Sequence, residues 1–556
     1  MVVEYNGKRF LTDNDLGVSL LGFYPGKDIK NSELRQRFIE QTGRDFLGGD
    51  EHVAYAQTLV SRGVDFDTVE EEILKDIQDG KKIEDITWSK TSTGIGRGHS
   101  LGGLSGVVLG VHGTKMIDSG LTGFVASRSL TTSSRRRETT EEEIVIPEAL
   151  MKRKDLLDEY LSISRDVFKM SKEFKEKFKK LGGVEVFNKV IPYNNPNDLY
   201  IVLPLDTMAT LAFEVQNDRK GFLPRELHAL NKKLDDIAKQ TGINVMHAQR
   251  KRVPRDTYLH YTVFKDPELG NYALEKGEEV GMSIKPVVLD VSIDFTPGFM
   301  KGLEYVKSMF EEAKKETNPE RLYEKSMKGM LAMRDFTGEN NEAVRVKVAD
   351  TLSWRVWSEQ KRHATLRQHV ESVYSAGPRA YNSMKELWPR IKAIGEGGEG
   401  QLPLGEIDKI IVVDEKLRNN PELLNAYVYH TAKQLMFYGK MIQEGFEERD
   451  ALYIVPKNIR LRTLENYDLI NLIDLEHPLR LCSSCEPERQ RNSWAKREVI
   501  AQAVPELDYF LQPKCNIGMC TEGKPFGPCG RIRSLREGYT QELHDAVKSV
   551  MLSRES

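Results

Sequence analysis

The apolar sequence LYIVLP at Leu199 to Pro204 recurs in shortened form as LYIVP at Leu452 to Pro456. Aliphatic and aromatic residues make up both stretches, and a proline closes each of them. Short apolar runs of this composition are typical of buried strands. The sequence therefore predicts a strand at each of the two positions.

A long helix is predicted ahead of each strand. Residues 148 to 181 carry apolar side chains at helical spacing, and glycines follow at 182 and 183. The second helix opens at Pro421 behind Asn420, and its apolar pattern runs toward Gly445. Because the same order of elements occurs twice, the sequence predicts a duplicated module, with chance recurrence of a few apolar letters as the alternative.

The chain has 556 residues, more than one hydrophobic core usually serves. We expect an α+β protein with a helical N-terminal lead-in at residues 1–90. A first module with a sheet and a long helix is expected at 91–290, and a second at 291–556 that ends in a cysteine-rich segment. Within the lead-in, the acidic first turn and apolar spacing of Thr68 to Ile77 predict an amphipathic helix.

Composition limits the classes of function. The 81 basic and 84 acidic residues give a net charge of -3, which excludes a globally basic nucleic-acid binder. The first residues show no apolar segment behind a basic cap. The longest weakly polar run, Leu101 to Val111, is shorter than the roughly 18–20 residues that a membrane span needs. We therefore expect a cytoplasmic protein without a membrane partner.

All five cysteines lie in the C-terminal part of the chain, within residues 482 to 529. Their odd number argues against a disulfide framework. Paired thiolates at C-x2-C and C-x4-C spacing could hold Zn²⁺ or an iron–sulfur cluster, with unligated buried thiols as the alternative. The predicted metal ligands are Cys482, Cys485, Cys515 and Cys520.

A basic strip lies between Trp357 and Tyr374. Two arginines, a lysine and two histidines fall within nine residues there, beginning with Lys361, Arg362 and His363. Cationic side chains with neighbouring hydroxyls favour a phosphorylated ligand. A solvated basic helix face is the alternative.

The same strip resembles the signature of the flavin-dependent thymidylate synthase family, an Arg-His-Arg triplet followed by a Ser-x-Arg-Tyr ending. Arg362 and His363 match the first two positions, Ala364 stands in place of the third arginine, and Ser372 matches the serine of the ending. The final Arg-Tyr pair is lost or shifted. The match is therefore partial.

Further motifs of that family are matched elsewhere. Gly98-His99-Ser100 resembles its Gly-His-x-Ser opening, and Ser133 to Arg137 resembles its Ser-x-Arg ending. Its Leu-Pro, Asn-x-Arg and Phe-Leu-x-x-Arg elements are matched in degenerate form in the first module by Leu203-Pro204, Asn217 to Arg219 and Phe222 to Arg225. The equivalent places in the second module are taken by Asp450 to Pro456, Asn471 and Leu479 to Cys482. The resemblance spans most of the chain.

The resemblance implies reductive methylation of dUMP to dTMP with FAD, NADPH and methylenetetrahydrofolate, by a homo-oligomer that uses no enzymic nucleophile, so that no catalytic side chain is predicted. It places FAD on Arg362, His363 and His99, and the nucleotide on Ser134, Arg136, Ser372 and Arg480. Two alternatives stay open. One is a flavin- or nucleotide-binding paralogue without synthase activity, and the other is a metal-stabilised nucleic-acid-binding protein.

Overall fold

The computed structural model contains two compact units, each built from several stretches of the chain. Unit 1 comprises residues 1–269, 372–403 and 415–459, and unit 2 comprises 270–371, 404–414 and 460–556. The structure describes residues 3–5, 7–14, 16–24, 30–42, 59, 64–65, 67–81, 106–121, 128–131, 144–177, 187–241, 263–268, 272–279, 284–361, 365–483, 485–517 and 541–555. No helix in these ranges is long and apolar enough to cross a membrane.

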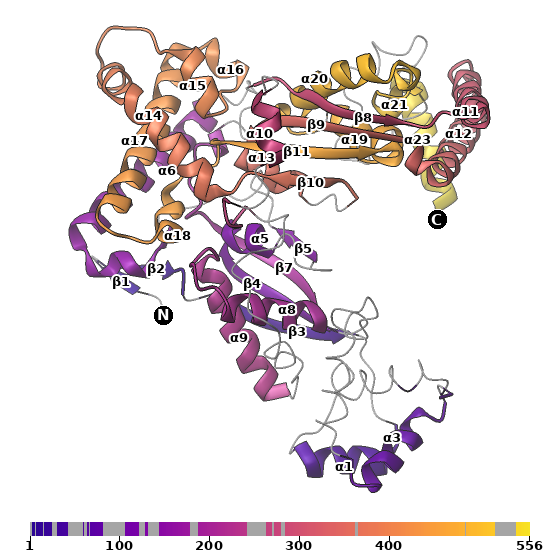
Figure 1. The fold of residues 1–556 in the computed structure, drawn as a ribbon, viewed down its shortest axis with the longest axis horizontal. Helices are drawn as coiled ribbons and strands as arrows, with labels where there is room; N and C mark the ends of the chain where they lie inside the picture. Colours follow the sequence, from indigo (N-terminus) through magenta and orange to yellow (C-terminus); the bar gives the residue numbers. More distant parts are fainter. Residues whose placement is uncertain are drawn as a thin grey trace. The chain divides into compact units, whose positions relative to one another are not determined.

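Unit 1 is centred on a four-stranded antiparallel sheet (Figure 1). Its strand order is β3 (Gly17–Tyr24), β4 (Gly106–Thr114), β7 (Pro196–Pro204) and β5 (Arg128–Thr131). Helices α5 (Lys115–Leu121), α8 (Leu205–Gln216) and α9 (Arg225–Thr241) pack against these strands. The apolar face of α9 closes the core of this unit through Leu227, Leu230 and Leu234.

Long helices form the rest of unit 1. α6 (Lys154–Lys177) and α14 (Val373–Gly395) both pack against α17 (Pro421–Gln443), and α16 (Glu415–Arg418) and α18 (Glu448–Ala451) flank α17. A small sheet pairs β1 (Val3–Tyr5), β2 (Lys8–Thr12) and β6 (Val145–Ile146). The pair α1 (Ser32–Thr42) and α3 (Val69–Gln78) has an apolar cluster of its own.

Unit 2 contains a second four-stranded antiparallel sheet (Figure 1). Its strand order is β8 (Val287–Ile293), β9 (Val344–Ser353), β11 (Arg460–Asp468) and β10 (Arg367–Val370). The helices of this unit are α10 (Tyr272–Glu279), α11 (Pro297–Lys314), α12 (Pro319–Glu339), α13 (Trp354–Gln360), α15 (Leu404–Ile410), α19 (Glu476–Leu481), α20 (Pro487–Ala503), α21 (Lys514–Ile517) and α23 (Gln541–Glu555).

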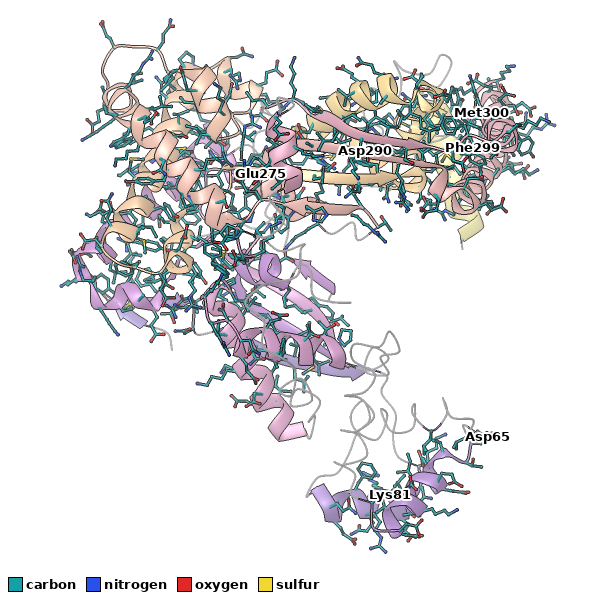
Figure 2. All side chains as sticks on the ribbon, in the orientation of Figure 1. Asp65, Lys81, Glu275, Asp290, Phe299 and Met300 are labelled. Carbon is teal, nitrogen blue, oxygen red and sulfur yellow. The ribbon has the colours of Figure 1, made fainter. Side chains whose placement is uncertain are left out.

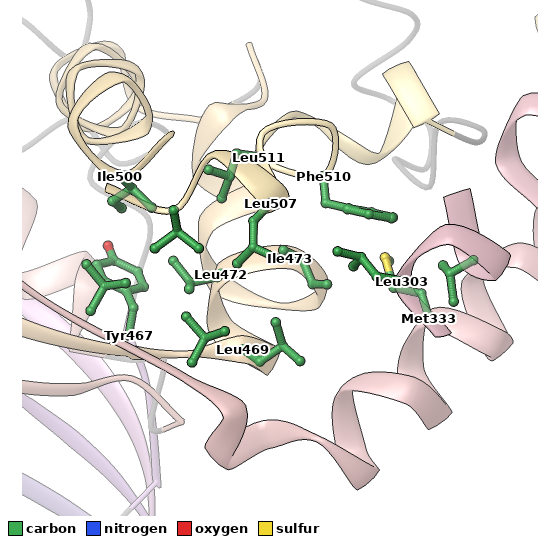
Figure 3. Close-up of a cluster of buried hydrophobic side chains, with 14 of the residues drawn as sticks. Leu303, Met333, Tyr467, Leu469, Leu472, Ile473, Ile500, Leu507, Phe510 and Leu511 are labelled. Atoms are coloured by element: carbon green, nitrogen blue, oxygen red, sulfur yellow. The ribbon is translucent and has the colours of Figure 1, made fainter. Parts of the chain in front are cut away.

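The apolar core of unit 2 joins the sheet to α11, α12 and α20. Figure 3 shows Leu303 and Met333 from the two helices facing Leu472, Ile473 and the 507–511 turn. α11 begins at Pro297 behind the cap Thr296, whose hydroxyl accepts the Phe299 amide. Figure 2 labels Phe299 and Met300 on this helix and Asp290 on β8.

The two sheets share one pattern of pairing. Thr114 pairs with Pro196 as Ser353 pairs with Arg460, and both ladders continue without a shift. The edge strands carry a bulge at the same place, between residues 20 and 22 of β3 and between 288 and 290 of β8. Strand order, direction, register and bulge therefore agree between the units.

Several local predictions are confirmed. Asn420 caps α17, because its Oδ1 accepts the Leu423 amide at 3.2 Å, and Pro421 is the first residue of that helix. The helices over residues 69–78 and 154–177 and the strand at 196–204 are also present.

The lead-in prediction was wrong at its start. Residues 3 to 24 form three strands, and β3 is an edge of the unit 1 sheet. The segment Gly17 to Tyr24 is rich in residues that suit a strand, and pairing with β4 fixes it. Residues 372–403 and 415–459 of the predicted second module belong to unit 1. The predicted module boundaries after residues 90 and 290 stay a prediction of which segments arose from the duplicated module.

The strand predicted at Leu452 to Pro456 was also wrong. Residues 452 to 454 form a 3-10 turn with buried side chains, and Pro456 makes a single bridge to Pro192. Proline cannot donate to a ladder, so the run ends there instead of extending. The strand equivalent to β7 is β11, a few residues later.

The two turns around this bridge resemble each other. The Asn194 side chain donates to Ser164 of α6 at 2.8 Å, and the Asn458 side chain donates to Thr431 of α17 at 2.9 Å. Each buried asparagine thus ties the turn before a central strand to a long helix.

Candidate functional site

A layer of charged side chains is buried between the sheet and the helices of unit 2. It consists of Asp350 on β9, Glu465 on β11, Glu476 and Arg480 on α19, and Arg489 and Lys496 on α20, and it is called the charged layer below. Five of the six side chains are essentially inaccessible to solvent, and Arg480 retains 13% exposure.

Ion pairs connect the members in series. Lys496 Nζ lies 2.9 Å from Asp350 and 2.6 Å from Glu465 Oε2. Arg489 reaches Glu465 Oε1 at 3.5 Å with Nη1 and Glu476 Oε1 at 3.4 Å with Nη2. Arg480 Nε donates to the same Glu476 oxygen at 2.9 Å. Three carboxylates therefore face three cations, and the layer is neutral as a whole.

The protonation states follow from this arrangement. Burial alone would raise the pKa of Glu465, but Lys496 and Arg489 outweigh it and lower that pKa to about 2. Burial lowers the pKa of His477 to about 3, and the nearby cations add to the effect. Glu465 is therefore ionised and His477 neutral at physiological pH.

Several polar atoms beside the charged layer have no partner among the described residues. They are Arg480 Nη2, Arg489 Nε, both ring nitrogens of His477, Trp357 Nε1 and Gln360 Oε1. Gln360 uses its amide group on Glu465, and Tyr467 donates to Glu465 at 2.5 Å. Buried polar groups ordinarily find partners. Arg480 Nη2, Arg489 Nε and Trp357 Nε1 are donors, and each suits an acceptor such as an anionic or carbonyl oxygen.

Unit 1 has apolar side chains at the matching positions. The positions of the two units are matched through a glutamate in the first turn of α9 in unit 1 and of α20 in unit 2. Glu226 of α9 accepts the Thr114 amide and hydroxyl at 2.9 and 2.6 Å, and Glu488 of α20 accepts the Ser353 amide and hydroxyl at 2.7 and 2.8 Å. Thr114 and Ser353 each end the second strand of their sheets.

Interior residues of the two units are matched when they lie the same number of residues from Thr114 and Ser353, from their strand partners Pro196 and Arg460, or from Glu226 and Glu488. The matches are Val111 with Asp350, Ile201 with Glu465, Leu227 with Arg489 and Leu234 with Lys496. All four residues of unit 1 belong to its hydrophobic core. Between sheet and helix, unit 1 therefore has apolar packing at these four positions, whereas unit 2 has ion pairs at the matching positions.

Known proteins are similar to part of this chain. No family model matches it. The flavin-dependent thymidylate synthase of Pyrococcus abyssi (strain GE5 / Orsay) is 25% identical over 191 residues, covering 33% of this chain and 77% of the relative. The enzyme of that name from Pyrococcus furiosus is 23% identical over 189 residues, covering 32% and 75%. The chain is therefore similar in sequence to flavin-dependent thymidylate synthases over about a third of its length.

A solved structure of thymidylate synthase X from Helicobacter pylori with FAD and dUMP also matches. It is 14% identical with a TM-score of 0.25, and the match covers 41% of this chain and 97% of that one.

Five of the seven predicted cofactor and nucleotide ligands lie outside the described residues. These are His99, Ser134, Arg136, Arg362 and His363. Of the predicted nucleotide ligands, Ser372 and Arg480 are described. The buried Ser372 hydroxyl donates to the Lys265 carbonyl at 2.6 Å and accepts the Tyr374 amide at 3.3 Å as the cap of α14. Arg480 belongs to the charged layer.

The cysteines are partly described. No group of three or more His, Cys, Asp or Glu side chains suited to a metal occurs in the part of the chain that the structure describes, and Cys520 lies outside it. Burial raises the pKa of the Cys485 thiol, and Arg480, whose Nη1 lies 4.0 Å from Sγ, opposes that rise. Cys515 packs at the cluster formed by α12 and α23.

Sequence reasoning missed most of the charged layer and reached Arg480 only through the family resemblance. A signal was present in the first part of α20, residues 487–498, where charged and polar side chains predominate and no apolar stripe is formed. A helix with no apolar face has to be solvated or to bury charges in pairs. Which of the two applies to α20 depends on the side chains packed around it, and the sequence of the helix does not contain that information.

Proposed function

We propose that the chain is a flavin-dependent thymidylate synthase, which converts dUMP to dTMP with methylenetetrahydrofolate as the one-carbon donor and NADPH as the reductant. The observation that carries this proposal is the sequence similarity to curated synthases, which spans three quarters of the Pyrococcus abyssi enzyme. FAD would supply the hydride chemistry. The proposal includes a homo-oligomeric assembly.

Arg480 and Ser372 are the two proposed nucleotide ligands in the described part of the chain, and Arg480 offers the donor. Its Nη2 is buried without a partner among the described residues, and Arg489 Nε and His477 next to Glu476 share that state. A guanidinium N–H held in a low-polarity interior favours a charged or carbonyl oxygen over water. This donor set therefore fits dUMP, which offers both phosphate and uracil oxygens.

The FAD assignment rests on the sequence motif alone. Arg362 and His363 are proposed to contact the flavin phosphates, with His99 as a further cofactor ligand. Ser134, Arg136 and Ser372 are proposed to contact the nucleotide. Because the Ser372 proton and one lone pair are already used within unit 1, the hydroxyl keeps only an acceptor position for this role.

We further infer that the two units descend from one duplicated module. Shared strand order, register and bulge, and the glutamate clamp at Thr114 and Ser353, support this inference. Of the proposed nucleotide ligands, Arg480 belongs to unit 2. In unit 1, Arg225 is held by both oxygens of Asp450, at 2.6 and 3.0 Å.

The second candidate is a flavin- or nucleotide-binding paralogue without synthase activity. Ala364 in place of an arginine and the engagement of Ser372 as a helix cap favour it. The two candidates differ only in turnover.

The test uses the purified full-length protein. Retained flavin absorbance supports both candidates, and tritium release from dUMP labelled at C5 supports the synthase, because methylation replaces that hydrogen. Arg480→Gln should abolish release, whereas Arg497→Gln, which changes an arginine of α20 paired with Asp508, should not. A colourless protein that binds neither added FAD nor dUMP would refute both candidates.

A further inference from the structure

We propose that Glu476 is the positioning residue for Arg480, and that the rest of the charged layer holds Glu476 in place. The proposal rests on the proposed function in one respect, since it takes Arg480 as the nucleotide ligand. It adds a residue that the motifs do not include.

Contacts at Glu476 carry the first step. Arg480 Nε and Arg489 Nη2 converge on one oxygen, Glu476 Oε1, at 2.9 and 3.4 Å. Glu476 and Arg480 are one helical turn apart on α19, so the contact also fixes the side-chain rotamer. With Nε engaged by Glu476, the guanidinium plane is set, and this fixes the directions in which Nη2, which has no partner among the described residues, can meet an acceptor.

The second step is the support behind Glu476. Arg489 links it to Glu465, and Lys496 links Glu465 to Asp350 on the central strand β9. The chain of ion pairs therefore runs from α19 to the rigid sheet. A ligand group is placed accurately when its neighbours are themselves fixed.

The third step is the contrast with unit 1. A buried ion-pair layer rarely stabilises a fold more than apolar packing does. Unit 1 has Val111, Ile201, Leu227 and Leu234 at the matching positions and forms the same sheet. The sheet therefore forms without charges at these positions. We attribute to the charges of unit 2 the positioning of Arg480.

The test compares two carboxylates of the same kind. Glu476→Gln removes the charge paired with Arg480. Asp450→Asn removes the charge of the closer of two carboxylates paired with Arg225 in unit 1, and Glu447 at 3.2 Å is the other. Phenylglyoxal modifies arginine, and peptide mass spectrometry reads its rate at each site. Glu476→Gln should accelerate modification of Arg480 several-fold and leave Arg225 unchanged, and Asp450→Asn should do the reverse. This readout needs no ligand.

The second readout is dUMP binding by equilibrium dialysis. Glu476→Gln should weaken it about tenfold or more, Glu476→Asp should recover part of the loss because it keeps the charge, and Asp450→Asn should stay within about twofold of the unchanged protein. If the unchanged protein binds no dUMP, the proposed function fails, and the modification rates still decide the positioning proposal.

An unchanged Arg480 modification rate in Glu476→Gln would overturn the proposal. So would dUMP binding equal to that of the unchanged protein. If this variant does not fold, Glu476→Gln with Arg489→Gln removes one charge of each sign, keeps the layer neutral and allows the same two measurements.

Discussion

Lys496 offers the sharpest test of how the charged layer acts on stability. Its ammonium group is fully buried between Asp350 and Glu465, at 2.9 and 2.6 Å. Lys496→Leu leaves two carboxylates with one cation fewer between them. Breaking a buried ion pair by removing one partner costs about 3–5 kcal/mol. We expect unit 2 to lose that amount of its free energy of unfolding.

The matched control takes its residues from unit 1. Asp350→Val, Glu465→Ile, Arg489→Leu and Lys496→Leu together introduce the residues found at Val111, Ile201, Leu227 and Leu234. The combination removes two charges of each sign and leaves Glu476 paired with Arg480. Replacement of a buried ion-pair set by apolar residues of similar volume is often neutral or stabilising by about 1–4 kcal/mol. The combined variant should therefore be far more stable than Lys496→Leu.

Urea unfolding followed by tryptophan fluorescence measures the effect, because Trp354, Trp357 and Trp494 all lie in unit 2. With a slope of about 2–3 kcal/mol/M, the single change should lower the midpoint by about 1–2.5 M. A midpoint within about 0.3 M of the unchanged protein would mean that Lys496 is not paired as described. A combined variant as unstable as Lys496→Leu would show that the two interiors are not interchangeable.

Three further predictions concern other parts of the chain. Burial raises the pKa of Glu226 from 4.5 to about 7, so unit 1 loses stability as pH rises through that range. Glu226→Gln should therefore flatten the fall in melting temperature between about pH 5 and pH 8. An unchanged slope would contradict this prediction. Arg362→Ala should weaken FAD retention about tenfold or more in a flavin-release assay, whereas Arg345→Ala, at an exposed surface ion pair, should not; equal flavin content would remove the assignment. Elemental analysis should find about one zinc or an iron–sulfur cluster per chain if the four cysteines predicted as ligands bind metal, and a metal-free protein with the same melting temperature in chelator would end that hypothesis.

The local elements show how far sequence alone reaches. α17 begins at Pro421 with Asn420 as its cap, because both residues act within one helical turn and need no distant partner. The strand at 196–204 was found for a similar reason, since its apolar residues suit a buried strand. The turn at 452–454 has the same letters, but its chain is held by the bridge to Pro192 and by burial on all sides.

The candidate site was predictable only in part. Arg480 came from a motif, which is a local pattern. Asp350, Glu465 and Lys496 lie far apart along the chain, and nothing in their immediate neighbours indicates that they meet. Their partners are set by strand register and by the position of α20.

Helices and strands could be predicted from the sequence where caps, periodicity and glycines act over a few residues, and the similarity to flavin-dependent thymidylate synthases is also a property of the sequence. The different interiors of two sheets of one topology became visible in the folded chain, with leucines at positions 227 and 234 of one unit and Arg489 and Lys496 at the matching positions of the other. The reason is that a charge can be buried only where an opposite charge meets it, and in this chain the partners come from distant strands.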